Sequence, residues 1–248
     1  MSHEYIVGEI VTNFLLNTCR LRPLPGKHVD DVLSSCAGIA AAHPPEDADA
    51  NLIPLITGSV AEFYIEPMLP HVGDIDVMHH CSIQLAIPRG YPPLLQLPAE
   101  FSNYVKVHEI VDSRLPGYVY LELRYLLTEC IDDDKYSCTE YERGMYLSHR
   151  TYKGDQRDIH GPARLVDYSH TSLLSVDQVH CVRCLSWPPQ AADWPTRHRN
   201  CDWPDSETVD RVVNNGCDVV GVAHRQCRQH EWLSKNQWRL SFSRAEMY

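Results

Sequence analysis

Two carboxylates one residue apart follow a Gly-Ser dipeptide in this chain, and together they could perform metal-dependent chemistry. Asp74 and Asp76 flank Ile75. On a β-strand the side chains of residues i and i+2 point to the same face, so both carboxylates can bind the same cations. Gly58-Ser59 can bring N–H groups and a hydroxyl close to a triphosphate, because glycine tolerates a tight turn. Mg²⁺ prefers one or two carboxylates plus phosphate oxygens, so the pattern fits metal-dependent nucleotidyl transfer.

A third carboxylate stands in a similar setting. Asp177 lies in the middle of the apolar, strand-like run 173–179. A carboxylate in such a run is costly to bury, so it is usually exposed, paired or bound to metal. Three acids on strands could hold two metal ions about 3.5–4 Å apart, one for the attacking hydroxyl and one for the leaving pyrophosphate. The alternative is that these acids are solvated residues at strand edges.

Composition is ordinary for a globular protein that forms one large domain or two lobes. The 248 residues are 44% hydrophobic and 22% charged, and no apolar run reaches the roughly 18 residues that span a bilayer. The first residues show no basic segment ahead of an apolar one, so we expect a cytoplasmic protein without a membrane partner. The net charge of −11 argues against a generally nucleic-acid-coated surface and leaves only small local basic patches.

The ten cysteines show no pattern of a disulfide scaffold, so we interpret them as reduced thiols. Cys181 and Cys184 form a CxxC pair, but no second pair at zinc-ribbon spacing is clear. We therefore interpret them as small buried residues. The adjacent His79 and His80, followed by Cys81, point to opposite faces of a strand and also favour a structural interpretation.

The sequence predicts helices first and then a mixed sheet. We therefore expect a fold of the α/β or α+β class. Apolar spacing predicts helices, and apolar or alternating runs predict strands. The segment between Leu126 and Gly144 is polar and turn-like. We expect helices at 6–19, 30–42 and 205–215, a helix that begins near Pro188, and strands at 74–87, 118–127, 173–184, 217–224 and 237–243.

Several segments together resemble the male-abnormal-twenty-one (Mab-21-like) nucleotidyltransferase superfamily, from about residue 50 onward. Within it the chain is most similar to the cyclic GMP-AMP synthase-like receptors of invertebrates. The most specific motif is Trp-Arg-Leu-Ser-Phe-Ser followed two residues later by Glu. The segments are Gly58-Ser59, Asp74-Ile-Asp76, Ser175-Val-Asp177, the run 184–194 and the run 238–246.

The resemblance implies a bilobed enzyme with a twisted mixed sheet and an N-terminal spine helix. It divides the chain into an N-terminal helical segment (1–50) and a nucleotidyltransferase domain (51–248), whose residues 188–248 lead to a C-terminal helical lobe. That lobe would begin near Tyr248, so it is largely missing here, and we expect weak or no turnover from this chain alone.

The resemblance also implies a function and a set of site residues. Such enzymes use Mg²⁺ or Mn²⁺ to join ATP and/or GTP into a cyclic dinucleotide, after sensing double-stranded RNA or DNA, in innate immunity. The metal ions would be held by Asp74, Asp76 and Asp177. The nucleotide would be bound by Gly58, Ser59, Arg239, Ser241, Ser243, Glu246 and either His224 or Arg225.

Two alternatives remain beside this enzyme. The chain could be a catalytically inactive nucleotide-binding or protein-interaction module of the same superfamily, used in signalling or development. It could also be an unrelated α/β protein with three incidental surface acids.

Overall fold

Strands dominate the described part of the chain. The computed structural model describes residues 6, 9, 10, 13 and 14, and the ranges 52–58, 74–130, 135–149, 159–167, 175–198 and 204–243. The strands are β1 (Leu52–Thr57), β2 (Asp74–Pro88), β3 (Tyr104–Asp112), β4 (Tyr118–Glu129), β5 (Tyr136–Glu140), β6 (Ile159–His160), β7 (Ala163–Asp167), β8 (Ser175–Cys184), β9 (Cys217–Gly221) and β10 (Gln237–Ser241). The short helices are η3 (Pro189–Ala191), α4 (Asp193–Thr196), α5 (Ser206–Asn215), η4 (Arg225–Cys227) and α6 (Glu231–Asn236).

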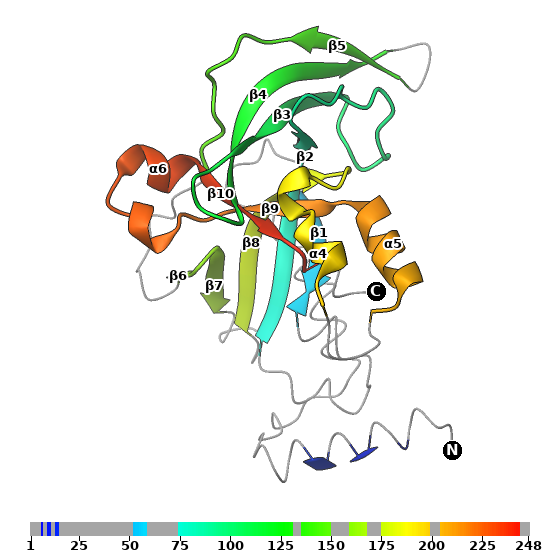
Figure 1. Ribbon diagram of the computed structural model, residues 1–248, viewed down its shortest axis with the longest axis vertical. Coiled ribbons are helices and arrows are strands. Elements are labelled where there is room, and N and C mark those ends of the chain that lie inside the picture. The colour runs from blue at the N-terminus through cyan, green and yellow to red at the C-terminus, as the bar shows by residue number, and fades with distance from the viewer. Residues whose placement is uncertain are drawn as a thin grey trace.

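All ten strands belong to one mixed, twisted sheet (Figure 1). Its order is β1-β2-β3-β4-β10-β9-β8-β7-β6, and β5 pairs with β4. The long strand β2 pairs in parallel with both β3 and β8, while the other pairs are antiparallel. Because β3 and β8 lie on opposite edges of β2, the six strands β2, β3, β4, β10, β9 and β8 form a closed circuit.

The main hydrophobic core lies on one face of this circuit, and each of the six strands contributes to it. Alternation along the strands explains the division of side chains between two faces. On β10, for example, Trp238 and Leu240 are buried, whereas Arg239 between them is exposed. The core cluster consists of Ala86, Ile110, Val119, Leu121, Val182, Cys184, Ala191, Cys217, Val219, Trp238 and Leu240.

The predicted mixed α/β fold is confirmed, and several predicted elements lie close to their expected bounds. Strands β2, β4, β8 and β10 each match an expected strand to within a few residues at either end, and β9 ends three residues earlier than predicted. Helix α5 begins after Asp205, whose carboxylate accepts a hydrogen bond from the Thr208 N–H at 2.7 Å. It ends at Gly216, whose φ of 78° suits glycine at a helix end.

The interpretation of residues 126–144 as turn-like was wrong. Strand β4 continues to Glu129, and β5 pairs with it through Tyr136 to Glu140, so most of the described part of this segment is a β-hairpin. The polar residues of β5 are compatible with a strand because β5 pairs with β4 at the outside of the sheet and four of its five residues are exposed (Figure 1). Residues 131–134 of this segment lie outside the described residues.

The predicted N-terminal helix can be compared with the structure at five positions. Ile6, Glu9, Ile10, Asn13 and Phe14 all have helical backbone, and all are exposed. The second predicted helix, at 30–42, lies outside the described residues. Of the helices in the described ranges, none has the length and apolar character needed to cross a membrane.

Candidate active site

Asp76 and Asp177 are direct neighbours on adjacent strands. They form a register pair between the parallel strands β2 and β8, and Asp74, the first residue of β2, pairs with Ser175 in the same ladder. Paired residues on neighbouring strands present their side chains to the same face of the sheet. The fold therefore brings together two of the carboxylates that the sequence analysis selected, from segments far apart in the chain.

Gly58 lies directly against the Asp76 carboxylate. The last pair between β1 and β2 joins Thr57 to Asp76, and Gly58 follows with a φ of 67°. A Cβ atom at this glycine would lie 1.9 Å from Asp76 Oδ2. Only a residue without a side chain allows this approach of backbone to carboxylate. Ser59, expected to contact the triphosphate, lies outside the described residues.

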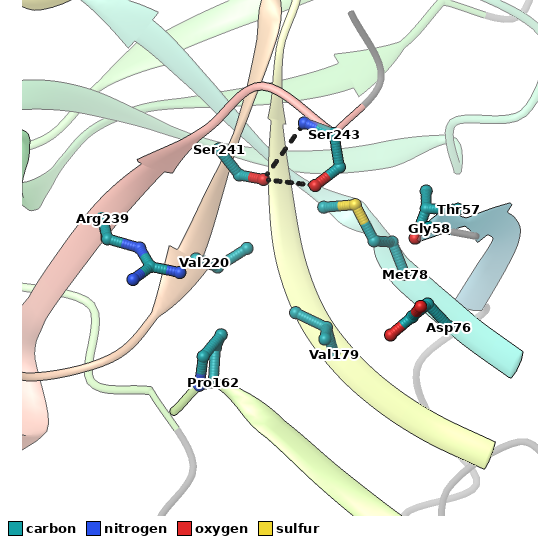
Figure 2. A pocket seen from close by; sticks show the side chains of 10 residues that line it. All are labelled: Thr57, Gly58, Asp76, Met78, Pro162, Val179, Val220, Arg239, Ser241 and Ser243. Atoms are coloured by element: carbon teal, nitrogen blue, oxygen red, sulfur yellow. Dashed lines mark hydrogen bonds between the residues drawn. The ribbon is translucent and has the colours of Figure 1, made fainter. Parts of the chain in front are cut away.

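A pocket extends from this carboxylate to β10 (Figure 2). Figure 2 shows Asp76 and Arg239 toward opposite sides, with Val179 between them. The pocket encloses about 180 Å³, less than the roughly 300–1,000 Å³ of sites that hold a whole drug-sized ligand. The described residues therefore outline room for only part of such a ligand. They are Thr57, Gly58, Asp76, Met78, Pro162, Val179, Val220, Arg239, Ser241 and Ser243.

Three polar residues on β10 and just after it line the pocket from the same face of the strand. Alternation places Arg239, Ser241 and Ser243 opposite the buried Trp238 and Leu240. The Ser241 and Ser243 hydroxyls lie 3.2 Å apart, and the Ser243 N–H donates to Ser241 Oγ at 3.5 Å (Figure 2). A guanidinium and two hydroxyls on this face can donate hydrogen bonds to a base, ribose or phosphate.

Of the remaining predicted nucleotide contacts, the described residues include only His224 and Arg225. Neither lines the pocket. The His224 ring packs edge-on against Tyr118 at 5.3 Å, and Tyr118 is the register partner of Arg239 on β10. Arg225 is exposed at the start of η4. Glu246 lies outside the described residues.

The apolar floor of the pocket was missed by the sequence analysis. Met78, Val179 and Val220 come from β2, β8 and β9, and Met78 pairs with Val179. A signal for two of them was present, since Met78 follows Asp76 by two residues and Val179 follows Asp177 by two. On strands that spacing repeats the same face.

The histidines and cysteines after the acids confirm the expected alternation. His79 and His80 are both buried on opposite faces of β2, and burial lowers the pKa of His79, as does the neighbouring His80. Cys181 and Cys184 are buried three residues apart on β8, so they belong to different clusters of the core. As expected of reduced thiols, no disulfide joins the described cysteines, which are Cys81, Cys130, Cys138, Cys181, Cys184, Cys217 and Cys227.

The strand-rich, mixed and twisted sheet with few helices is consistent with the nucleotidyltransferase fold. Residues 94–248 match the family model described as the Mab-21 protein nucleotidyltransferase domain. This match covers more than half of the chain, so the protein belongs to the Mab-21 nucleotidyltransferase family. The matched range contains Asp177 and the β10 residues. It begins after Gly58, Asp74 and Asp76, later than the start near residue 50 that the resemblance indicated.

Proposed function

We propose that this protein is a metal-dependent nucleotidyltransferase that joins ATP and/or GTP into a cyclic dinucleotide, as a cyclic GMP-AMP synthase-like receptor of innate immunity. The proposal is carried by the register pair of Asp76 and Asp177 beside the Gly58 backbone. Family membership supports nucleotide substrates and the general class of nucleotidyl transfer.

The donor set of the site suits a hard divalent cation. Carboxylate oxygens from Asp76 and Asp177, with Asp74 at the start of β2, are the ligands that Mg²⁺ prefers, and Mn²⁺ accepts the same set. Bound Mg²⁺ would neutralise triphosphate charge and lower the pKa of the attacking ribose hydroxyl. Asp74 and Asp76 would hold the donor side, and Asp177 would complete the acceptor side.

The other residues of the pocket would position the nucleotide. Gly58 and Ser59 would place backbone N–H groups and a hydroxyl at the donor triphosphate. Arg239 would contact a nucleobase across the apolar floor, and Ser241 and Ser243 would bind ribose or phosphate oxygens. Glu246 and either His224 or Arg225 would complete the pocket. The attacking hydroxyl then forms a bond to the α-phosphorus as the bond to pyrophosphate breaks, so positioning supplies much of the rate.

We also propose that double-stranded RNA or DNA in the cytoplasm binds this protein and activates it. The support is the likeness to the receptor branch of the superfamily, together with the small basic patches in a chain of net charge −11. Because each phosphate contact releases counterions, the salt dependence of binding grows with the number of contacts, so a small patch predicts weak binding with a shallow salt dependence.

Product analysis tests the proposal. The chain would be incubated with ATP, GTP and Mg²⁺ or Mn²⁺, with and without double-stranded RNA or DNA, and products separated by chromatography and identified by mass. We expect a small yield of cyclic dinucleotide from the wild-type chain, in line with the weak turnover expected of it, and at least a hundredfold less from Asp177→Asn. Asp210→Asn, an exposed carboxylate on α5, is the matched control and should retain wild-type yield. Absence of product, with nucleotide binding retained, would favour the inactive binding module instead.

A further inference from the structure

We propose that His80, Cys181 and Asp218 form a second metal site, for a zinc-like transition metal, that is separate from the carboxylate site. One ligand atom from each residue, an imidazole nitrogen, a thiol sulfur and a carboxylate oxygen, lies within 4.8 Å of the other two. All three residues are buried, with exposed fractions of 3%, 3% and 0%. It is the one such group of three in the part of the chain that the structure describes.

Three adjacent strands deliver these ligands to one point. His80 on β2 pairs with Cys181 on β8, so their side chains share a face. Asp218 on β9 pairs with Arg183, two residues beyond Cys181 and therefore on the same face of β8. The His80 Nε2 atom lies 2.8 Å from Asp218 Oδ1, which shows how close the ligand atoms already are.

The cluster lies two register layers beyond the catalytic carboxylates. His80 follows Asp76 by four residues on β2, and Cys181 follows Asp177 by four on β8. At about 3.3 Å per residue the two sites are about 13 Å apart along the strands. The pair of Met78 and Val179 fills the layer between them. A metal ion here would therefore not share ligands with the nucleotide site.

Arg183 provides the outer support that ligating carboxylates usually have. Its Nη1 lies 3.4 Å from Asp218 Oδ1 and donates to the Cys217 carbonyl at 3.0 Å. Its Nη2 donates to the Asn215 carbonyl and, at 3.0 Å, to Asn215 Oδ1. The guanidinium is thus anchored to the end of α5 and the start of β9, and this anchoring fixes the orientation of Asp218 beside His80.

The nitrogen, sulfur and oxygen donors select the class of metal. Mg²⁺ and Ca²⁺ prefer oxygen ligands alone, whereas Zn²⁺ and Co²⁺ bind imidazole, thiolate and carboxylate together. Three protein ligands leave a fourth tetrahedral position for water. The competing account is a hydrogen-bonded polar cluster, in which the Arg183 charge balances Asp218 and the Cys181 thiol stays protonated.

Cobalt spectroscopy distinguishes the two accounts. The purified full chain, treated with chelator and reductant, would be titrated with CoCl₂ while absorption is recorded. We expect one equivalent of Co²⁺ to produce a thiolate-to-cobalt charge-transfer band and the visible bands of tetrahedral Co²⁺. Cys181→Ser should lose the charge-transfer band. Cys217→Ser is the matched control. This thiol is also buried and is the sequence neighbour of Asp218, but it belongs to the main hydrophobic core on the other face of the strand, so the variant should keep the band.

The wild-type chain decides the matter even if a variant fails to fold. After loading with Zn²⁺, X-ray absorption should show one sulfur ligand at about 2.3 Å and nitrogen or oxygen ligands at about 2.0–2.1 Å. Absence of a charge-transfer band from wild type, a band that persists in Cys181→Ser, or a zinc shell without sulfur would each overturn the proposal. Cobalt bound at the catalytic carboxylates would give no thiolate band, so it cannot mimic the expected result.

Discussion

The contact between Gly58 and Asp76 shows how one residue without a side chain shapes the candidate site. The Asp76 carboxylate occupies the space that a Cβ at Gly58 would need, since such a Cβ would lie 1.9 Å from Asp76 Oδ2. It also has a φ of 67°, in the left-handed region that other residues rarely adopt. Two separate effects, backbone strain and collision with Asp76, therefore follow from any substitution.

Gly58→Ala should displace the Asp76 carboxylate and lower metal-dependent nucleotide binding by at least tenfold. Gly90→Ala separates strain from collision, because Gly90 has a φ of 79° but nothing within 4 Å of its added Cβ. We expect both variants to lose about 1 kcal/mol of folding stability from strain. Only Gly58→Ala should lose binding, as measured by calorimetric titration with Mn²⁺ and a non-hydrolysable ATP analogue. Equal binding by the two variants would contradict the proposed role of Asp76.

His108 makes the folding stability depend on pH. Its side chain is 3% exposed, and neither ring nitrogen has a hydrogen-bond partner among the described residues. Burial lowers its pKa from 6.5 to about 4, with a smaller contribution from the Lys106 charge. As the pH falls below 6.5, the unfolded chain binds a proton here and the folded chain does not. Stability from this residue is therefore lost between pH 6.5 and 4, by about 3 kcal/mol.

Urea unfolding at a series of pH values checks this prediction. His108→Leu should show a flatter decline of unfolding free energy between pH 6.5 and 4 than the wild-type chain. His198→Leu, which replaces an exposed histidine, is the control and should keep the wild-type slope. The same slope in His108→Leu and wild type would show that His108 does not cause the decline.

At the scale of elements, a network of charged side chains joins strands β3 and β4 to residues 141–143, which follow β5. Glu109 and Glu122 are register partners and both are buried, an arrangement that like charges alone would oppose. Arg124 lies 3.9 Å from Glu109 and donates to the Tyr141 carbonyl at 2.7 Å. Arg143 bonds Glu122 at 3.0 Å and Glu109 at 3.4 Å. The two arginines thus make this close pair of carboxylates tolerable.

Arg124→Met should destabilise the fold by about 3 kcal/mol, because it leaves a buried carboxylate with less compensating charge. Arg143→Met is the matched comparison. Its side chain is 52% exposed, so water can replace much of what it provides, and we expect a loss of about 1 kcal/mol. Unfolding free energies from urea titrations measure both, and an Arg143→Met loss as large as that of Arg124→Met would refute the assignment of burial as the cause.

Elements with a local signature were predictable, and elements that depend on distant partners were not. Strands β2, β8 and β10 have apolar or alternating residues, and α5 has a capping Asp205 and a closing Gly216. Strand β1 was missed, and it contains Pro54, which is acceptable only because β1 is an edge of the sheet. Strand β3 was also missed, although the alternation in residues 104–112 could have revealed it.

At the scale of the whole molecule, the parallel pairing of β2 with β8 creates both candidate sites. It places Asp76 beside Asp177, and four residues further on it places His80 beside Cys181. The sequence could predict the first pairing because both acids stand in strand-like runs. It could not predict the pairing of His80 with Cys181. The CxxC spacing directs attention to Cys184 on the same strand, whereas the polar neighbours of Cys181 are His80 on β2 and Asp218 on β9.

The most direct test of the central claim is a count of bound Mn²⁺ by electron paramagnetic resonance, with and without a non-hydrolysable ATP analogue. The claim is that Asp74, Asp76 and Asp177 hold two divalent cations with the nucleotide. We predict two nucleotide-dependent Mn²⁺ ions per wild-type chain and at least one fewer in Asp177→Asn, whether or not the chain turns over. Mn²⁺ binding that does not depend on nucleotide, or an unchanged count in Asp177→Asn, would contradict it.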